Sequence, residues 1–194
     1  CIGIETITLP DTIENIGYSA FKNCPNLKKV IISENSSLET IDAYAFQNCT
    51  ALTDITFPSS LSKIEAYAFY NCTNLDSIVC LASVSPTLYR YAFKNTKSSR
   101  KRTIPFGSNY TAWEDPYAWS KTYHLIQEND TITLESDFMI TNKVGLINNG
   151  VLRIPYGKQL IDTTNGIITG IIEVETDILS NSRWSFVGAP FSNY

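Results

Sequence analysis

Apolar side chains recur along the first half of the chain at a nearly constant interval. An Ala-Phe pair marks each repeat, at Ala20-Phe21, Ala45-Phe46, Ala68-Phe69 and Ala92-Phe93, so the spacings are 25, 23 and 24 residues. An aliphatic residue precedes each pair, and a leucine and two further apolar residues follow the first three pairs at nearly constant offsets. A repeat of this length is typical of a solenoid, in which each coil buries its apolar face against its neighbours.

A short alternation of apolar and polar residues ends each repeat and predicts one strand per coil. The inward set is expected to be Ile7, Leu9, Val30, Ile32, Ile55, Phe57, Ile78 and Cys80. The outward set, which we call the strand ribbon, is expected to be Thr6, Thr8, Lys29, Ile31, Asp54, Thr56, Ser77 and Val79. Stacked coils place these strands side by side in a parallel sheet. We therefore predict that the strand ribbon is the candidate partner-binding surface.

Cysteine recurs in the repeat, most visibly in the blocks YAFQNC and YAFYNC. Cys1, Cys24, Cys49 and Cys72 share one register position, and Cys80 lies in a predicted strand. We interpret them as small buried hydrophobes, because Thr96 takes the same position in the last coil. Two alternatives are disulfides between neighbouring coils, which need Cα atoms about 4.4–6.8 Å apart, and a soft metal bound by stacked thiols.

Cys1 fits the tail of an earlier repeat, so the chain is expected to be part of a longer protein; a lipidated N-terminal cysteine is the rival interpretation. The consensus I-x-x-x-A-F-x-x-C-x-x-L-x-x-I-x-(L/F)-P over residues 1–96, with the closing segment 102–128, resembles the BspA-like leucine-rich repeats of bacterial surface proteins. Thr96 departs from this pattern, and so does Arg102, where an apolar strand residue is common.

The resemblance implies a mainly β fold: a right-handed leucine-rich-repeat solenoid of short stacked parallel strands, closed by a short helical cap. We expect this solenoid over residues 1–128, with the cap at 97–128 and its helical stretch at 108–123. The aromatic residues Tyr110, Trp113, Tyr117, Trp119 and Tyr123 are expected to cover the open end of the core. An exposed aromatic platform for carbohydrate is the alternative.

Residues 129–194 have a different pattern of apolar and polar residues. They are expected to form a small all-β module, cut short by the end of the sequence. Short period-2 segments predict strands, and Asn148-Asn149-Gly150 predicts a hairpin turn. Longer strands are expected at 167–176 and 183–191. A carbohydrate-binding module in 129–194 is one alternative source of function.

Charge adds one further candidate site. The chain has a net charge of −4 and a pI of about 5.0, which argues against general nucleic-acid binding. A basic run lies between two acidic parts and consists of Lys94, Lys97, Arg100, Lys101 and Arg102. It is interpreted either as a solvated loop or as a contact for an anionic partner, such as a sulfated glycan or an anionic cell surface.

Candidate chemistry is otherwise sparse. His124 is the one histidine, and none of the common nucleophile, phosphate-loop or zinc-protease motifs occurs. We therefore expect no enzyme, cofactor or metal site, and no apolar run is long enough to cross a membrane. The resemblance implies an extracellular, cell-surface protein, expected to be monomeric, that adheres to a host or matrix protein or a glycan. A spacer that presents other domains is the alternative.

Overall fold

The computed structural model describes residues 1–110, 113, 121–127, 130–134, 138–140, 144–149, 151–154, 160–162 and 171–174. The chain divides into two compact units, residues 1–120 and residues 121–194. Within the described residues of both units, the regular structure is parallel β-strands.

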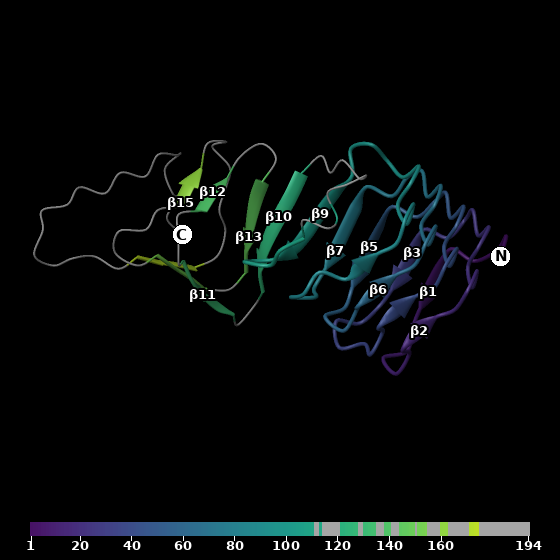
Figure 1. Ribbon diagram of the computed structural model, residues 1–194, viewed down its shortest axis with the longest axis horizontal. Coiled ribbons are helices and arrows are strands. Elements are labelled where there is room, and N and C mark those ends of the chain that lie inside the picture. The colour runs from purple at the N-terminus through teal and green to yellow at the C-terminus, as the bar shows by residue number, and fades with distance from the viewer. Residues whose placement is uncertain are drawn as a thin grey trace, which may run out of the picture. The chain divides into compact units, whose positions relative to one another are not determined.

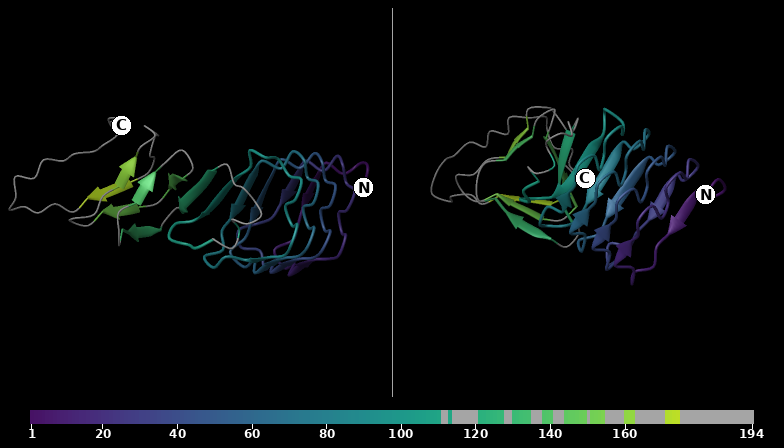
Figure 2. Two further views of the ribbon diagram at one scale, coloured as in Figure 1. Left: turned by 45° about the horizontal axis from the view of Figure 1, so that its top comes forward. Right: turned by 45° about the vertical axis from the view of Figure 1, so that its right-hand side comes forward.

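The first unit is a solenoid whose coils lie side by side in sequence order (Figures 1 and 2). Its strands are β1 (Thr6–Thr8), β2 (Asn15–Ile16), β3 (Lys29–Ile31), β4 (Thr40–Ile41), β5 (Asp54–Phe57), β6 (Lys63–Ile64), β7 (Ser77–Cys80), β8 (Thr87–Leu88) and β9 (Lys101–Pro105). On one face β1 pairs with β3, and β5, β7 and β9 pair in that order. On another face β2, β4, β6 and β8 form a four-stranded sheet.

The core of the solenoid contains the residues that the alternation placed inward. Val30, Ile55, Phe57 and Ile78 are at most 5% exposed, and of the predicted inward set only Ile7 is more than marginally accessible, because it lies in the first coil. Neighbouring strands pair without any shift, so that Ile55 lies opposite Ile78. The prediction of an inward-facing apolar set is confirmed.

The Ala-Phe block forms a tight turn with two residues in left-handed backbone conformation. Tyr44 has a φ of 61° and Asn48 a φ of 62°, and the other coils repeat both values closely. Left-handed backbone costs most residues about 1–2 kcal/mol, but asparagine tolerates it better. Hydrogen bonds between coils hold the turn, such as the one from the Phe46 amide to the Ala68 carbonyl, at 2.7 Å.

Two columns of identical side chains run through these turns. The rings of Phe21, Phe46, Phe69 and Phe93 stack with centroids 5.1–5.2 Å apart. Asn48 Nδ2 donates to Asn23 Oδ1 at 2.7 Å, and Asn71 Nδ2 donates to Asn48 Oδ1 at 3.0 Å. The phenylalanine column contributes apolar burial, and the asparagine column links the turns by hydrogen bonds.

The last coil is covered by Tyr110 and Trp113, which are 2% and 0% exposed. The Trp113 ring lies 6.0 Å from that of Phe93 and so continues the stack. This burial confirms that the two residues cover the core, and it contradicts an exposed carbohydrate platform at these positions. Tyr117 and Trp119 lie outside the described residues.

The predicted helix over 108–123 is wrong at its C-terminal end. Residues 121–123 belong to strand β10 (Lys121–Ile126) of the second unit, and no helix is found among the described residues of the cap. The aromatic spacing of three to four residues mimics a helical face. Here Tyr110 and Trp113 fill the end of the core, and the Trp113 amide donates to the Tyr110 carbonyl at 2.9 Å.

The second unit repeats three strands per coil. After β10 its strands are β11 (Thr131–Thr133), β12 (Phe138–Ile140), β13 (Val144–Asn148), β14 (Val151–Ile154), β15 (Leu160–Asp162) and β16 (Ile171–Val174). β10 pairs with β13, β11 with β14, and β12 with β15, all in parallel. Thr122 lies opposite Val144 and Thr131 opposite Val151, which gives a coil of 22 or 20 residues.

The predicted hairpin at Asn148-Asn149-Gly150 is wrong. β13 and β14 flank these residues but belong to different sheets, and each pairs in parallel with a strand of the preceding coil. β13 and β14 therefore do not pair with each other as the two strands of a hairpin would. The predicted strand at 167–176 contains β16, whereas that at 183–191 lies outside the described residues, so an all-β fold for the whole of 129–194 stays a prediction.

Replacing Asn48 by alanine is expected to lower the free energy of unfolding by about 2–4 kcal/mol, measured by urea denaturation. Alanine loses two ladder hydrogen bonds, each worth about 1 kcal/mol, and carries the left-handed strain of about 1–2 kcal/mol. Asn48→Gly is the matched control, because it loses the same bonds but accepts the backbone angle, and we expect it to be milder by about 1 kcal/mol. Equal losses would show that backbone conformation does not select asparagine here.

Candidate functional site

The strand ribbon forms one outward face across β1, β3, β5 and β7. Thr6, Thr8, Lys29, Ile31, Asp54 and Thr56 are exposed, whereas Ser77 and Val79 are partly buried. Ile31 is 41% exposed, which is high for an isoleucine in a strand. The coils thus bring all eight predicted residues to one face of the solenoid.

Register divides this face into two columns with different chemistry. Thr6 lies opposite Lys29, and Asp54 opposite Ser77, so one column is polar and of mixed charge. The other contains only β-branched residues: Thr8, Ile31, Thr56 and Val79. β-Branched side chains are stiff and stand upright on a pleated surface. The second column therefore presents a flat, half-apolar strip.

Strand β9 extends both columns, which the sequence analysis did not recognise. Lys101 lies opposite Ser77, and Thr103 lies opposite Val79. Lys101 is exposed and Thr103 is buried. The signal for this extension was the alternation of outward and inward positions in Lys101-Arg102-Thr103-Ile104. It was hard to recognise because a basic residue, Arg102, takes an inward position.

The basic run does not form a single exposed cluster. The Lys94 ammonium lies 4.6 Å from the centre of the Tyr91 ring, and Lys97 Nζ lies 3.3 Å from Asp76 Oδ2. Arg100 and Arg102 are 7% and 4% exposed, so these two arginines are buried rather than displayed on the surface. Lys94, Lys97 and Lys101 remain exposed.

Arg102 is buried because it occupies an inward strand position opposite Ile78. One of its Nη1 hydrogens is donated to the Tyr110 carbonyl at 3.1 Å. The Tyr110 hydroxyl donates to the Ala82 carbonyl at 2.6 Å, and Trp113 Nε1 donates to the Pro86 carbonyl at 2.9 Å. Burial raises the pKa of the Tyr110 phenol, which stays protonated as a donor. Arg102 is thus part of the cover over the core.

The cysteines occupy the interior, as the packing interpretation predicted. Cys24, Cys49, Cys72 and Cys80 are buried, Cys1 is exposed, and all five are free thiols. The Cys49 thiol lies 3.1 Å from the Phe21 carbonyl, and the Cys72 thiol lies 3.1 Å from that of Phe46. Burial raises the pKa of Cys49 to about 12 and also raises that of Cys72. These thiols therefore lack the thiolate character that disulfide exchange and metal binding need.

Other candidate chemistry is equally limited in the part of the chain that the structure describes. No group of three or more His, Cys, Asp or Glu side chains is arranged to hold a metal there. His124 is partly buried in β10. Among the described residues, no helix is long and apolar enough to cross a bilayer.

A tyrosine column on another face was missed as a surface by the sequence analysis. Tyr44 and Tyr67 stack with centroids 5.1 Å apart at an angle of 5°, and Tyr91 lies 5.3 Å from Tyr67. All three rings are partly buried, and Tyr18, at the start of the column, is 69% exposed. The available signal was a tyrosine two or three residues before each repeat phenylalanine.

Comparison with known proteins points to one family. A family model described as BspA type Leucine rich repeat region matches residues 1–124 in six copies. No curated protein matches the chain. A crystal structure of a leucine rich cell surface protein from Faecalibacterium prausnitzii is 22% identical, with a TM-score of 0.39. That match covers 87% of this chain but only 60% of the other protein, less than two thirds of its length.

Native protein is expected to react with a thiol-specific dye at Cys1 alone, and at all five cysteines once it is denatured. The four buried thiols are inaccessible to the dye, and burial also raises the pKa of Cys49, Cys72 and Cys80, which disfavours their reactive thiolates. Mass spectrometry of the labelled protein measures the number and position of the adducts. Rapid labelling of Cys49 or Cys72 in the native state would contradict the buried, high-pKa environment.

Stability is expected to fall as the pH rises above about 9. Thiols of the unfolded chain ionise near their ordinary pKa of 9.0, whereas folded Cys49 stays protonated up to about pH 12. A pKa raised by folding stabilises the protein below the unfolded value and loses that contribution as pH rises through the folded one. Urea midpoints measured from pH 7 to pH 11 test this, and Cys72→Ala should show a shallower pH dependence.

Proposed function

Because this chain belongs to the BspA-type leucine-rich repeat family, which its model matches over residues 1–124, we propose that it is a cell-surface protein that binds another protein through the strand ribbon. Stacked repeats offer long continuous binding faces, which is how solenoid proteins are generally used. The observation that carries the proposal is the half-apolar column through Ile31 and Val79. Leucine-rich repeat surface proteins are generally not enzymes, and we expect no turnover.

The size of the ribbon constrains the complex. Four strands at about 4.8 Å spacing are roughly 14 Å wide, and two outward residues on one strand are about 7 Å apart. The area spanned by these outward residues is well below the roughly 800 Å² that each partner buries in a stable complex. The partner therefore contacts flanking turns as well, and the ribbon alone is expected to bind weakly.

Because the polar column carries charges of both signs, we do not expect binding by the ribbon to depend strongly on salt concentration. Lys29 and Asp54 carry opposite charges on neighbouring strands, and Asp54 Oδ2 already accepts a hydrogen bond from Thr53 Oγ1 at 2.8 Å. Exposed pairs of this kind contribute little affinity and are screened by salt. Apolar contact at Ile31 and Val79 is therefore the expected main source of affinity.

Ile31→Glu combined with Val79→Glu is expected to weaken binding to immobilised matrix proteins at least about tenfold, because both charges would be desolvated at the interface. The readout is surface plasmon resonance against fibronectin, laminin and collagen, with melting temperatures measured in parallel. Both side chains face outward, so the double variant should melt within a few degrees of the wild type.

The matched control is Ile2→Glu combined with Val84→Glu. These residues are 81% and 80% exposed and lie outside the strands of the ribbon, so the control adds the same charge without changing a ribbon residue. Equal binding by both double variants would exclude the ribbon. A spacer role, the alternative, predicts no specific binding by the wild type at all.

A further inference from the structure

A second surface of the first unit combines stacked tyrosines with basic residues. We call it the tyrosine stripe and define it as Tyr18, Tyr44, Tyr67, Tyr70 and Tyr91. The Tyr18 ring meets Tyr44 edge-on at 5.6 Å, and Tyr70 meets Tyr67 edge-on at 5.6 Å. The stripe therefore crosses four successive coils without interruption.

Packing alone accounts for the rings of the stripe but not for their hydroxyls. The neighbouring inner column performs the same stacking with phenylalanine at every coil. Within the described residues, the hydroxyls of Tyr44, Tyr67 and Tyr91 make no hydrogen bond to the protein, while that of Tyr70 accepts one from Asn95. A row of phenol groups is thus left for solvent or a ligand.

Basic side chains lie against this row. Lys22 Nζ is 5.0 Å from the centre of the Tyr44 ring, Lys94 Nζ is 4.6 Å from that of Tyr91, and the Arg90 guanidinium is 6.0 Å from the same ring. Such contacts hold a cation close to a ring face without neutralising it. The ion pairs found among the described residues use Lys28, Lys63 and Lys97 instead.

The geometry of the rings selects the kind of ligand. Ring faces are occupied by neighbouring rings or by cations, so the stripe presents ring edges and hydroxyls. An aromatic edge is the positive part of the ring quadrupole, and a phenol hydroxyl is a hydrogen-bond donor. Edges, hydroxyls and ammonium groups all favour an anionic, oxygen-rich partner over an apolar one.

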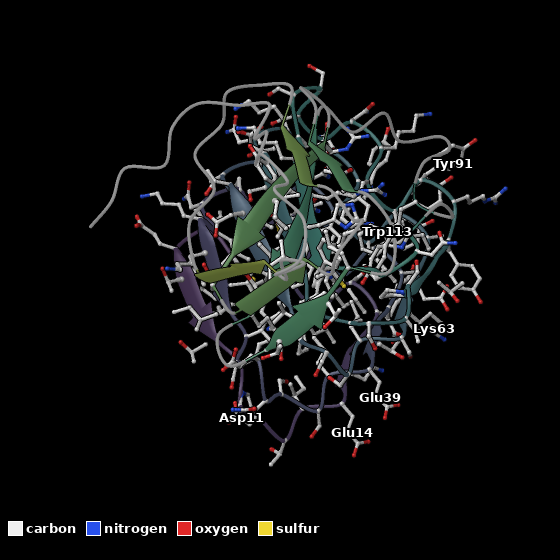
Figure 3. The ribbon with its side chains drawn as sticks, turned by 90° about the vertical axis from the view of Figure 1, so that its left-hand side faces the viewer. Asp11, Glu14, Glu39, Lys63, Tyr91 and Trp113 are labelled. Atoms are coloured by element: carbon white, nitrogen blue, oxygen red, sulfur yellow. The ribbon has the colours of Figure 1, made fainter. Side chains whose placement is uncertain are left out.

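Acidic residues do not cancel this preference. Glu65 is paired with Lys63 at 3.1 Å, whereas Asp42 keeps its charge, because its hydrogen-bond donor at 3.2 Å is the neutral Asn15 amide. In Figure 3 the labelled acids Asp11, Glu14 and Glu39 lie along a different part of the rim from Tyr91, and Trp113 lies nearer the middle. Three cations, Lys22, Arg90 and Lys94, lie at the rings of the stripe, so positive charge predominates over that of Asp42.

We propose that the tyrosine stripe is a binding site for an acidic polysaccharide, one whose carboxylate or sulfate groups lie along the row of coils. A protein partner usually anchors apolar side chains in pockets, whereas the exposed tips of this stripe are hydroxyl, ammonium and guanidinium groups. Tyrosine recurs at each of the four coils, which suits a repeating polymer, and the cations lie at the first coil, with Lys22, and at the last, with Arg90 and Lys94. This site is distinct from the strand ribbon and does not depend on the function proposed for it.

The test measures binding of the whole chain to immobilised heparin and polygalacturonate, with dextran as the neutral polymer and poly-L-glutamate as the acidic peptide. Binding to at least one acidic polysaccharide is expected, weakening as salt rises from about 50 mM to about 500 mM. Lys22→Gln with Lys94→Gln should lose about tenfold in affinity. Tyr44→Phe with Tyr67→Phe should lose about threefold, because it removes hydroxyls and keeps the stack.

The matched control is Lys29→Gln with Lys101→Gln, which removes two exposed charges from the ribbon face instead. It should bind within about twofold of the wild type at equal salt. Equal losses in the two lysine variants would overturn the proposal, as would wild-type binding by the tyrosine variant. Failure to bind either polysaccharide, or equal binding of poly-L-glutamate, would also overturn it.

Discussion

The fold of the first unit depends on one constraint: each coil must present the same groups to the next coil at a separation of about 5 Å. Parallel hydrogen bonds impose this spacing on the backbone, and the rings of Phe46 and Phe69, 5.1 Å apart, meet it in the core. An unshifted stack tolerates few changes at a turn. This is why Asn48 and its equivalents take left-handed backbone angles in coil after coil.

The same constraint separates packing from recognition. Residues at inward positions, including the buried cysteines, are held by the need to stack, and their chemistry is suppressed by burial. Outward residues do not have to stack against the next coil in this way. We therefore expect function on the outer faces, and the described part of the solenoid has two of different chemistry: the half-apolar strand ribbon, and the hydroxyl-rich, basic tyrosine stripe.

Sequence reasoning succeeded where a contact repeats with the coil and failed where it does not. The inward strand positions and the phenylalanine stack followed from the period. The helix over 108–123 was inferred from aromatic spacing, and the hairpin at 148–150 from local turn preference. Both signals are local, whereas Lys121–Ile126 and Val144–Asn148 are organised by pairing with strands about twenty residues away.

The sequence by itself determined the solenoid, its interior and the face on which the ribbon lies, because a repeat that cannot bury itself alone dictates its neighbours. Only the tertiary structure decided which charges remain exposed. Arg100 and Arg102 read as surface residues, yet stacking against the last coil buries both, and Arg102 is held by the Tyr110 carbonyl. Stacking likewise set the rings of Tyr44 and Tyr67 face to face, since the packing of one coil on the next is a non-local property.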